Sequence, residues 1–282
     1  MAARSLPRLI GIEDAVAGPS VTSRVFAILN AFVPGEARLT LTQISGRTGL
    51  PMATAHRLVH ELVRCGGLER EEGGTYRVGV RLWEIGSLAP VRGGLRELAI
   101  PYMEDLYEAT HENIQLAVLV GLEAMILEKI SGRDSVPIVT RVGGRLPLHA
   151  TGVGKVLLAY SAPEVVEAVT TGELKRYASR TIVDADLLLR DLAVVRARGY
   201  SVTSDEMTES AMSVGAPVFG PDQDVVAALS VVVDSRTGDP ERLALPVRTA
   251  ARGLSRQVGD WWDRIVPGAA DLNMRPPAAS AD

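Results

Sequence analysis

The chain has 282 residues, of which 46% are hydrophobic, 4% aromatic and 23% charged, and its formal net charge is −4 at pH 7. This length allows two domains with separate cores, and no apolar run reaches the roughly 18–20 residues of a membrane span. Residues 1–18 lack the apolar centre of a signal peptide, and the single cysteine, Cys65, excludes an intrachain disulfide and a cysteine-rich metal site. We therefore expect a cytoplasmic protein with no membrane partner.

The charge is divided unevenly along the chain. Residues 21–90 carry eight arginines against six carboxylates, whereas residues 91–282 carry 20 basic and 26 acidic residues. An acidic protein can bind nucleic acid through a local positive surface, because phosphate neutralisation depends on the contact face alone. The local excess here is small, so we expect dimerisation to double any DNA contact.

Residues 1–20 are expected to form a flexible lead-in to a first domain over 21–79. Ser20 or Thr22 can cap a helix that runs to about Phe32. The buried stripe of this helix is expected to hold Val21, Val25, Ile28 and Leu29.

A helix-turn-helix is predicted next. A short helix from Leu41 to Thr48 is stopped by Gly49, which can adopt a left-handed turn. Pro51 then opens a second helix, Pro51–Cys65, at the first helical position, where its missing N–H has no cost. The buried face of this second helix is predicted to hold Ala55, Leu58, Val59 and Leu62.

A β-hairpin follows this helix pair. Leu68–Arg70 and Thr75–Val78 flank a turn that contains Gly73-Gly74. The exposed face of the second helix fits the DNA major groove, and the hairpin can contact the neighbouring backbone. Any amphipathic helix could show this pattern by packing alone, but the order of the elements favours DNA binding. The predicted DNA contacts are Thr42, Ala53, Thr54, His56, Arg57, His60 and Arg77.

Residues 80–94 are predicted to link the two domains. Val80–Leu88 is predicted to be a helix with more apolar surface than a connector needs. Pro90 and Gly93-Gly94 are expected to end this helix. We expect this helix to pair with its counterpart in a second subunit. Its apolar residues are Leu82, Trp83, Ile85 and Leu88.

The second domain, 95–266, combines strand hairpins with grouped helices, and the tail 267–282 is expected to be disordered. The expected strands are Asn113–Val120, Ala124–Ile130, Val136–Val142, Tyr200–Ser204, Val214–Phe219 and Val225–Val233. The expected helices are Leu95–Thr110, Thr151–Tyr160, Pro163–Thr170, Asp184–Arg198 and Pro240–Arg264. This order predicts an α+β fold on a mainly antiparallel sheet.

The segment Gly152-Val153-Gly154-Lys155 invites comparison with a phosphate-binding loop. His149 and Val156 stand where that loop needs a glycine and a serine or threonine, so the match fails. A glycine-rich helix start can still bind a carboxylate through free backbone N–H groups. The glycines could equally serve only close packing of a helix on a sheet, and the segment alone leaves both interpretations open.

The other polar clusters give little support for catalysis. Asp205-Glu206 with Glu209 could act as acid and base, but a solvated loop is the more common explanation. His56 and His60 lie one helical turn apart without a third metal ligand. We therefore predict no catalytic residue, no metal site and no cofactor.

These residues resemble the IclR-type bacterial transcription regulators over nearly all of 21–266. In the first domain the match runs from Thr42 to Leu58 and continues at Gly66-Gly67-Leu68. Two domains that match in order are more specific than a lone helix-turn-helix. The matching phrases of the second domain are Leu146–Ala159, Arg198–Tyr200 with Asp205-Glu206, Gly215–Val218 and Val225–Val231.

The resemblance implies an N-terminal winged helix-turn-helix domain, a linker helix and a C-terminal effector-binding domain with a GAF-like fold. It also implies a homodimer or homotetramer on a palindromic operator in double-stranded DNA, with a small organic or aromatic acid as effector. This chain has Met52 and Ala53 where many members carry Lys and Ser. It has Ser213 where many carry Cys, and Thr203 where some carry Asp. By position, the implied effector contacts are Thr151, Gly152, Val153, Thr203, Ser213 and Ser230.

The sequence thus predicts a ligand-responsive DNA-binding repressor of a metabolic or catabolic operon that senses a small carboxylate and carries out no catalysis. One alternative is an enzyme of small acids fused to a winged helix, with His149, Lys155 and Asp205 in its active site. Another is a sensory module whose winged helix contacts only proteins. Turnover of a small acid would favour the first alternative, and absence of specific DNA binding would favour the second.

Overall fold

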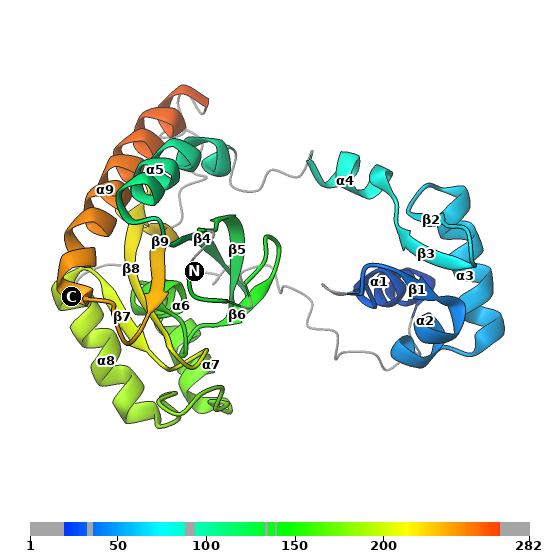
Figure 1. The fold of residues 1–282 in the computed structure, drawn as a ribbon, viewed down its shortest axis with the longest axis horizontal. Coiled ribbons are helices and arrows are strands. Elements are labelled where there is room, and N and C mark those ends of the chain that lie inside the picture. Colours follow the sequence, from blue (N-terminus) through cyan, green and yellow to red (C-terminus); the bar gives the residue numbers. More distant parts are fainter. Residues whose placement is uncertain (1–19, 33–35, 88–93, 133–134, 139, 266–282) are drawn as a thin grey trace, which may run out of the picture. The chain divides into compact units, whose positions relative to one another are not determined.

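The computed structural model describes residues 20–32, 36–87, 94–132, 135–138 and 140–265. The chain divides into two compact units, Met1–Pro90 and Val91–Asp282, drawn with their elements labelled in Figure 1. The division falls inside the segment 80–94. Residues 1–19 of the lead-in, Leu88 and the tail 267–282 lie outside the described residues.

The first unit combines helices with a small antiparallel sheet in the order β1-β3-β2. Its hairpin, β2 (Leu68–Arg70) and β3 (Thr75–Val78), confirms the predicted wing. The strand β1 (Leu39–Thr40) was not predicted, because two residues show no alternation. The helices are α1 (Val21–Asn30), α2 (Leu41–Thr48), α3 (Met52–Arg64) and α4 (Val80–Ser87).

Local capping explains where the helices of the helix-turn-helix begin and end. Thr40 and Gln43 form a reciprocal capping box at the start of α2, and Gly49 ends that helix with a φ of 67°. Pro51 is the N-cap of α3 and not its first helical residue, so the helix begins one residue later than predicted. Val21 is 57% exposed at the first position of α1, so its predicted burial is wrong. The predicted buried face of α3 is confirmed at Ala55, Leu58, Val59 and Leu62.

The second unit is built on a six-stranded sheet in the order β6-β5-β4-β9-β8-β7, with every neighbouring pair antiparallel. This confirms the predicted α+β fold class. The strands are β4 (Asn113–Val120), β5 (Glu123–Ile130), β6 (Arg145–Pro147), β7 (Ser201–Ser204), β8 (Ala211–Phe219) and β9 (Val225–Asp234). The helices are α5 (Leu95–Thr110), α6 (Gly152–Ala159), α7 (Pro163–Thr171), α8 (Ala185–Arg198) and α9 (Pro240–Ile265).

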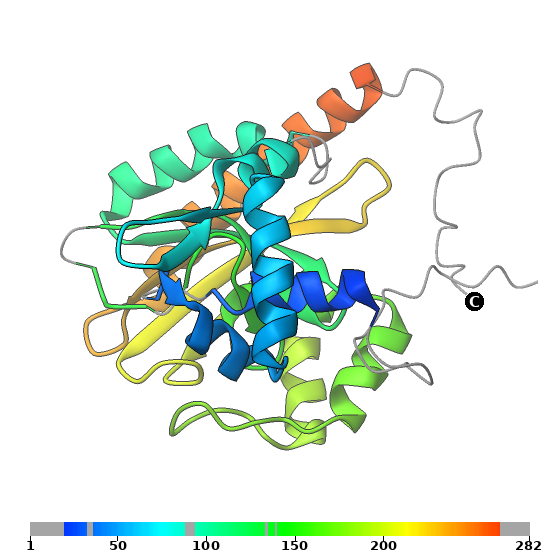
Figure 2. The ribbon, with the colours of Figure 1, turned by 90° about the vertical axis from the view of Figure 1, so that its right-hand side faces the viewer.

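The two faces of this sheet differ in chemistry. Helices α5 and α9 lie side by side on one face in both Figure 1 and Figure 2, over aliphatic residues such as Val214 and Val231. Helices α6 and α8 pack on the other face. Side chains alternate between the two faces along a strand. Ser213 and Ser230, which are next to Val214 and Val231 in sequence, therefore point to the opposite face, toward α6. The sheet therefore presents hydroxyl groups to α6.

The predicted strand Val136–Val142 is wrong, and β6 (Arg145–Pro147) pairs with β5 instead. The backbone of this segment is not paired with a strand. Side chains of the sheet form hydrogen bonds with it instead. Asn113 Nδ2 donates to the Val136 carbonyl at 2.9 Å, and Lys129 Nζ donates to the Thr140 carbonyl at 3.0 Å. An apolar run next to Pro137 reads as a strand in sequence, but these contacts satisfy its backbone differently.

Candidate functional sites

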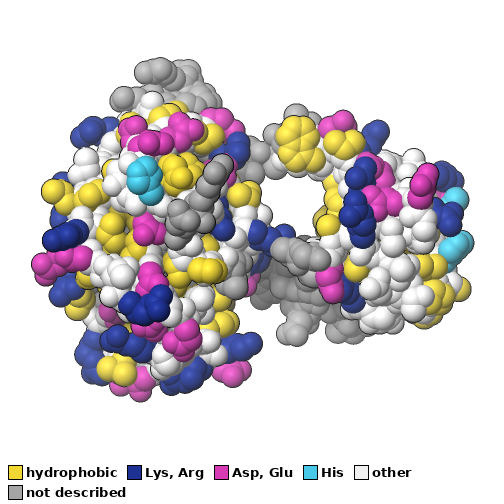
Figure 3. Space-filling view, viewed as in Figure 1, with side chains coloured by type: hydrophobic (Ala, Val, Ile, Leu, Met, Phe, Trp, Pro, Cys, Tyr) yellow, Lys and Arg dark blue, Asp and Glu magenta, His cyan; other side chains and the backbone are white. Residues whose placement is uncertain are grey.

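The polar face of α3 lies open at the surface of the first unit. Ala53, His56, Arg57 and His60 are exposed, and Thr54 is half-buried. Figure 3 shows basic and histidine side chains gathered over this helix. Within the described residues, Arg57 makes no ion pair or hydrogen bond, so its guanidinium is available to a partner. Thr42, the remaining predicted contact on a helix, is exposed near the start of α2.

Arg77, predicted to contact DNA from the wing, is engaged inside the protein. It donates from Nε and Nη2 to Glu69 Oε2 at 2.9 and 2.6 Å. These hydrogen bonds raise the pKa of the exposed Arg77 guanidinium, and the Val80 N–H and Arg77 lower the pKa of Glu69. Glu69 thus ties the wing to the first turn of α4. The cross-strand register of Glu69 with Arg77 is the sequence signal that could have revealed this pair.

His56 and His60 do not form a metal site with other described residues. Their ring centroids are 6.4 Å apart. In the described ranges, no group of three or more His, Cys, Asp or Glu side chains could hold a metal ion. Both histidines are better placed as surface groups of α3.

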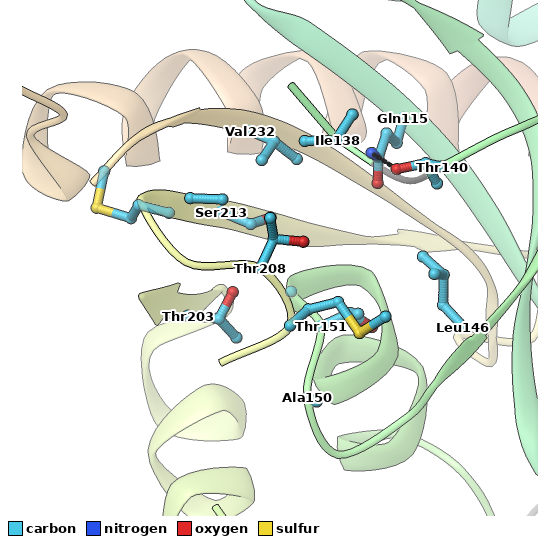
Figure 4. A pocket seen from close by; sticks show the side chains of 14 residues that line it. Gln115, Ile138, Thr140, Leu146, Ala150, Thr151, Thr203, Thr208, Ser213 and Val232 are labelled. Carbon is cyan, nitrogen blue, oxygen red and sulfur yellow. Dashed lines mark hydrogen bonds between the residues drawn. The ribbon is translucent and has the colours of Figure 1, made fainter. Parts of the chain in front are cut away.

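A cavity opens between the start of α6, the strands β7 to β9 and the loop 205–210 (Figure 4). We call it the inner pocket. It is a small, partly open cavity, whose roughly 440 Å³ of empty space includes the solvent at its mouth. Four predicted effector contacts meet here, namely Thr151, Gly152, Thr203 and Ser213. The other lining residues are Gln115, Ile138, Thr140, Leu146, Ala150, Met207, Thr208, Ala211, Met212 and Val232.

The described lining of the inner pocket contains hydroxyl groups and no charged side chain. The hydroxyl groups of Thr203, Thr208 and Ser213 make no hydrogen bond with the described chain, so they can serve a ligand. Thr151 is already used, because it donates to the Pro147 carbonyl at 2.9 Å and accepts from the Gly154 N–H at 3.1 Å. A ligand therefore meets neutral hydrogen-bond donors rather than a cation.

The start of α6 adds backbone donors to this lining. The N–H groups of Gly152 and Val153 belong to the first helical turn and have no intrahelical acceptor. The Val153 side chain points into the core beneath α6 and does not line the pocket. A helix start with free N–H groups attracts negative charge by about 0.3–2 kcal/mol.

Ser230 lies on the same face of the sheet but deeper than the pocket wall. Its register partners are Gln115 on β4 and Gly215 on β8. Its side chain is fully buried, and Oγ has no hydrogen-bond partner in the described chain. Sequence reasoning missed Gln115, although a polar residue in an otherwise apolar strand was a usable signal. It also missed Thr140, which lies in the segment wrongly predicted as a strand, and Met207 and Thr208, which lie in a loop without a pattern.

The glycines of α6 permit close contact with the sheet. A Cβ added to Gly152 would lie 2.4 Å from Ser213 Oγ. One added to Gly154 would lie 2.6 Å from the Leu148 carbonyl oxygen, and one on Gly215 would lie 3.1 Å from the Gly152 backbone. The packing interpretation of the glycines is therefore confirmed, and the same contact brings the helix start to the pocket.

The residues considered for an enzyme do not converge. Lys155 Nζ donates to Glu206 at 2.8 Å, whereas Asp205 accepts from the Ser210 N–H at 2.7 Å. His149 Nε2 lies 3.0 Å from the Lys175 carbonyl, and burial lowers the pKa of its imidazole. The expectation of a solvated acidic loop is wrong for Glu206, whose side chain is buried against Lys155.

A winged helix-turn-helix joined to a domain with a polar ligand pocket defines a DNA-binding transcription regulator that responds to a small molecule. Comparison with known families agrees. Residues 21–72 match the IclR helix-turn-helix domain, and residues 90–256 match the bacterial transcriptional regulator IclR C-terminal domain. The chain belongs to the IclR family of bacterial transcriptional regulators, which confirms the resemblance seen in the sequence.

Individual relatives match over most of both chains. The HTH-type transcriptional regulator KipR of Bacillus subtilis is 33% identical over 237 residues, covering 83% of this chain and 94% of the relative. The HTH-type transcriptional repressor AllR of Klebsiella pneumoniae is 29% identical over 247 residues, covering 86% and 91%. An IclR homolog from Microbacterium hydrocarbonoxydans, crystallised with 4-hydroxybenzoate, is 36% identical with a TM-score of 0.80, covering 85% of this chain and 99% of its own.

This protein is therefore a ligand-responsive, DNA-binding transcriptional regulator, and the family consists of regulators rather than enzymes. None of the described helices is long and apolar enough to cross a membrane.

Proposed function

We propose that this regulator represses a metabolic operon and leaves its operator when a small carboxylate binds in the inner pocket. The observation that carries the proposal is the meeting of free hydroxyl groups with the start of α6 in one cavity, an arrangement suited to an anion with hydrogen-bond acceptors. The 4-hydroxybenzoate bound by one relative and the repressor name of another support it. Since its target is chromosomal DNA, we propose that it acts in the cytoplasm.

The proposed effector contacts differ in how they act. Thr203 and Ser213 donate from their hydroxyls, and Gly152 and Val153 donate from the backbone at the start of α6. Thr151 holds the first turn in shape as its N-cap. Ser230 lies beneath the residues that line the pocket and acts through a bound water. Its unpartnered Oγ would form a hydrogen bond with this water.

A direct test uses DNA release by small acids. The protein is bound to an operator selected from a random DNA library and titrated with 4-hydroxybenzoate, benzoate, pyruvate and, as a neutral control, benzamide. We expect one or more acids to release the DNA and the matched amide to have no effect. Recovery of the acid unchanged distinguishes a sensor from an enzyme of small acids. If no acid alters DNA binding, the proposed effector class is wrong.

For DNA reading, we propose that Arg57, Thr54 and His56 contact bases from α3, with Thr42, Ala53 and His60 beside the DNA backbone. Because an arginine bidentate to guanine contributes about 1–3 kcal/mol of discrimination, Arg57→Ala should weaken specific binding about tenfold or more. Arg77 is proposed to reach phosphate only by leaving Glu69, so Arg77→Ala should have the smaller effect.

The matched control for this experiment is Arg64→Ala. Arg64 lies on the same helix, is exposed and pairs with Glu61 at 3.5 Å. The Arg64→Ala substitution removes the same charge from the same helix and should leave the preference of the protein for its DNA sequence unchanged. Equal losses for Arg57→Ala and Arg64→Ala in a binding titration would show a general charge effect and contradict base reading by Arg57.

We also propose that two subunits pair through α4. Val80 is 62% exposed, Trp83 72% and Ile85 57%, an apolar surface visible over α4 in Figure 3. Burying these side chains in a homodimer would remove them from water and hold two α3 helices about 34 Å apart, one turn of DNA. A tetramer would join two such dimers on a longer operator. A monomer mass by light scattering with and without DNA would contradict this assembly.

A further inference from the structure

A cluster of three charged side chains, two of them buried and one half-buried, lies outside the lining of the inner pocket. Lys155 is 1% exposed, and its Nζ lies 2.7 Å from Asp191 Oδ2, 2.7 Å from Glu206 Oε2 and 2.8 Å from Glu206 Oε1. We call Lys155, Asp191 and Glu206 the ion triad. They come from α6, from α8 and from the loop between β7 and β8. One ammonium group thus connects three segments that are distant in sequence.

The ion triad joins two walls of the inner pocket from outside the cavity. Glu206 directly precedes Met207 and Thr208, which line the pocket from the loop 205–210. Lys155 lies one helical turn after Thr151 and Gly152, which line it from the start of α6. The ion pair between Lys155 and Glu206 therefore fixes the separation of these two walls.

The remaining contacts of the loop leave Glu206 as its main link to α6. Asp205 accepts hydrogen bonds from within its own hairpin, at the Ser210 N–H, and from Ser235. The Glu206 carbonyl accepts from Thr181 Oγ1 at 2.5 Å. These bonds shape the loop, but only the Glu206 carboxylate reaches the helix among the polar contacts of the described residues.

Stability alone does not account for the ion triad. Two carboxylates share one ammonium group, so one negative charge of the ion triad is left without a counter-charge inside the triad. Buried ion pairs of this kind are often no more stable than apolar residues of the same volume. In some proteins such pairs serve instead to specify one arrangement of the groups that they join. These observations favour a role for the ion triad in positioning the segments that it joins over a role in stabilising the fold.

We propose that Lys155 is a positioning residue that, through Glu206 and Asp191, holds the loop 205–210 against α6 and so sets the affinity of the inner pocket for its effector. This inference rests on the proposed function of the inner pocket. Loss of the link lets Met207 and Thr208 move away from Thr151, which widens the pocket and weakens binding.

The first test needs no effector. Glu206→Gln keeps the size of the side chain and removes its charge, and hydrogen exchange is measured at the amides of 205–210 and of β4. We expect exchange in the loop to quicken at least about tenfold, which is about 1.4 kcal/mol of local opening, while β4 changes less than about twofold. Glu209→Gln is the comparison variant, because it removes the same charge from the same loop and weakens the contact of the loop with Ser179 without touching Lys155.

The second test measures binding with 4-hydroxybenzoate as the probe. We expect Glu206→Gln to raise its Kd at least about fivefold and to leave operator affinity without the acid unchanged. If loop exchange is unaltered by Glu206→Gln, or quickens equally in Glu209→Gln, the positioning role is refuted. If the wild type does not bind the probe, the proposed effector class fails while the exchange result still decides the role of the ion triad.

Discussion

The contact between Gly152 and Ser213 gives a prediction whose size follows from the structure. A Cβ at position 152 would lie 2.4 Å from Ser213 Oγ and 3.1 Å from Ser213 Cβ, and β8, which carries Ser213, is held by a neighbouring strand on each side. Overpacking of this kind destabilises by about 1–3 kcal/mol. The better helix propensity of alanine offsets up to about 1 kcal/mol. We therefore expect Gly152→Ala to lower the free energy of unfolding by about 1–2 kcal/mol.

Urea denaturation followed by far-UV circular dichroism measures this loss, and a double-mutant cycle assigns its cause. Ser213→Ala removes the closest atom, so the double variant should recover about half of the loss or more. Gly259→Ala is the control, since no described atom lies within 4 Å of its added Cβ and α9 should tolerate it. A Gly152→Ala protein as stable as the wild type, or a double variant without recovery, would refute the close-packing argument.

Three further predictions concern assembly and pH. Trp83→Glu should convert the proposed dimer to a monomer at micromolar concentration, because it puts a charge in the proposed apolar contact, and an unchanged mass by light scattering would contradict this. Burial raises the pKa of Glu206, so the folded state takes up a proton more readily than the unfolded state. In urea titrations, the free energy of unfolding of the wild type should increase relative to that of Glu206→Gln as the pH falls toward 4.5. A difference between the two proteins that does not change with pH would contradict this prediction. Burial lowers the pKa of His149 below 6.5, so its stabilising contribution is lost as the pH falls from 6.5. The advantage of the wild type over His149→Gln should shrink in that range, and an advantage that grows would contradict this reasoning.

Much of the fold could be predicted because its signals are local. Gly49 marks the turn of the helix-turn-helix through a left-handed conformation, and Asp184 and Gly199 mark the two ends of α8. Strands with a continuous apolar run, such as β4 and β9, are recognised because both of their faces are covered. The segment 136–142 shows the limit of this signal, since it has the composition of a strand but its backbone is held by side chains.

The sites were less predictable because they depend on contacts between distant segments. Thr151 and Gly152 could be identified, since a capped, glycine-rich helix start is visible in the sequence. Thr208 could not, because nothing in its loop shows that the loop turns toward α6. Lys155 was considered only as part of an active site, and its actual partners lie 36 and 51 positions further along the chain, at Asp191 and Glu206.

The uncharged lining of the inner pocket separates the two binding events of this regulator. DNA binding neutralises phosphates and releases counterions, so it weakens steeply as salt is added. The lining of the inner pocket offers an anion only neutral polar groups and the short-range dipoles of the α6 start, and Lys155 on the same helix is already paired with Glu206. Hydrogen bonds in a partly enclosed site respond little to ionic strength. Salt should therefore change operator affinity strongly and effector affinity little. The proposed release of DNA by the effector would then reflect a change in the protein rather than competition between two anions for one basic surface.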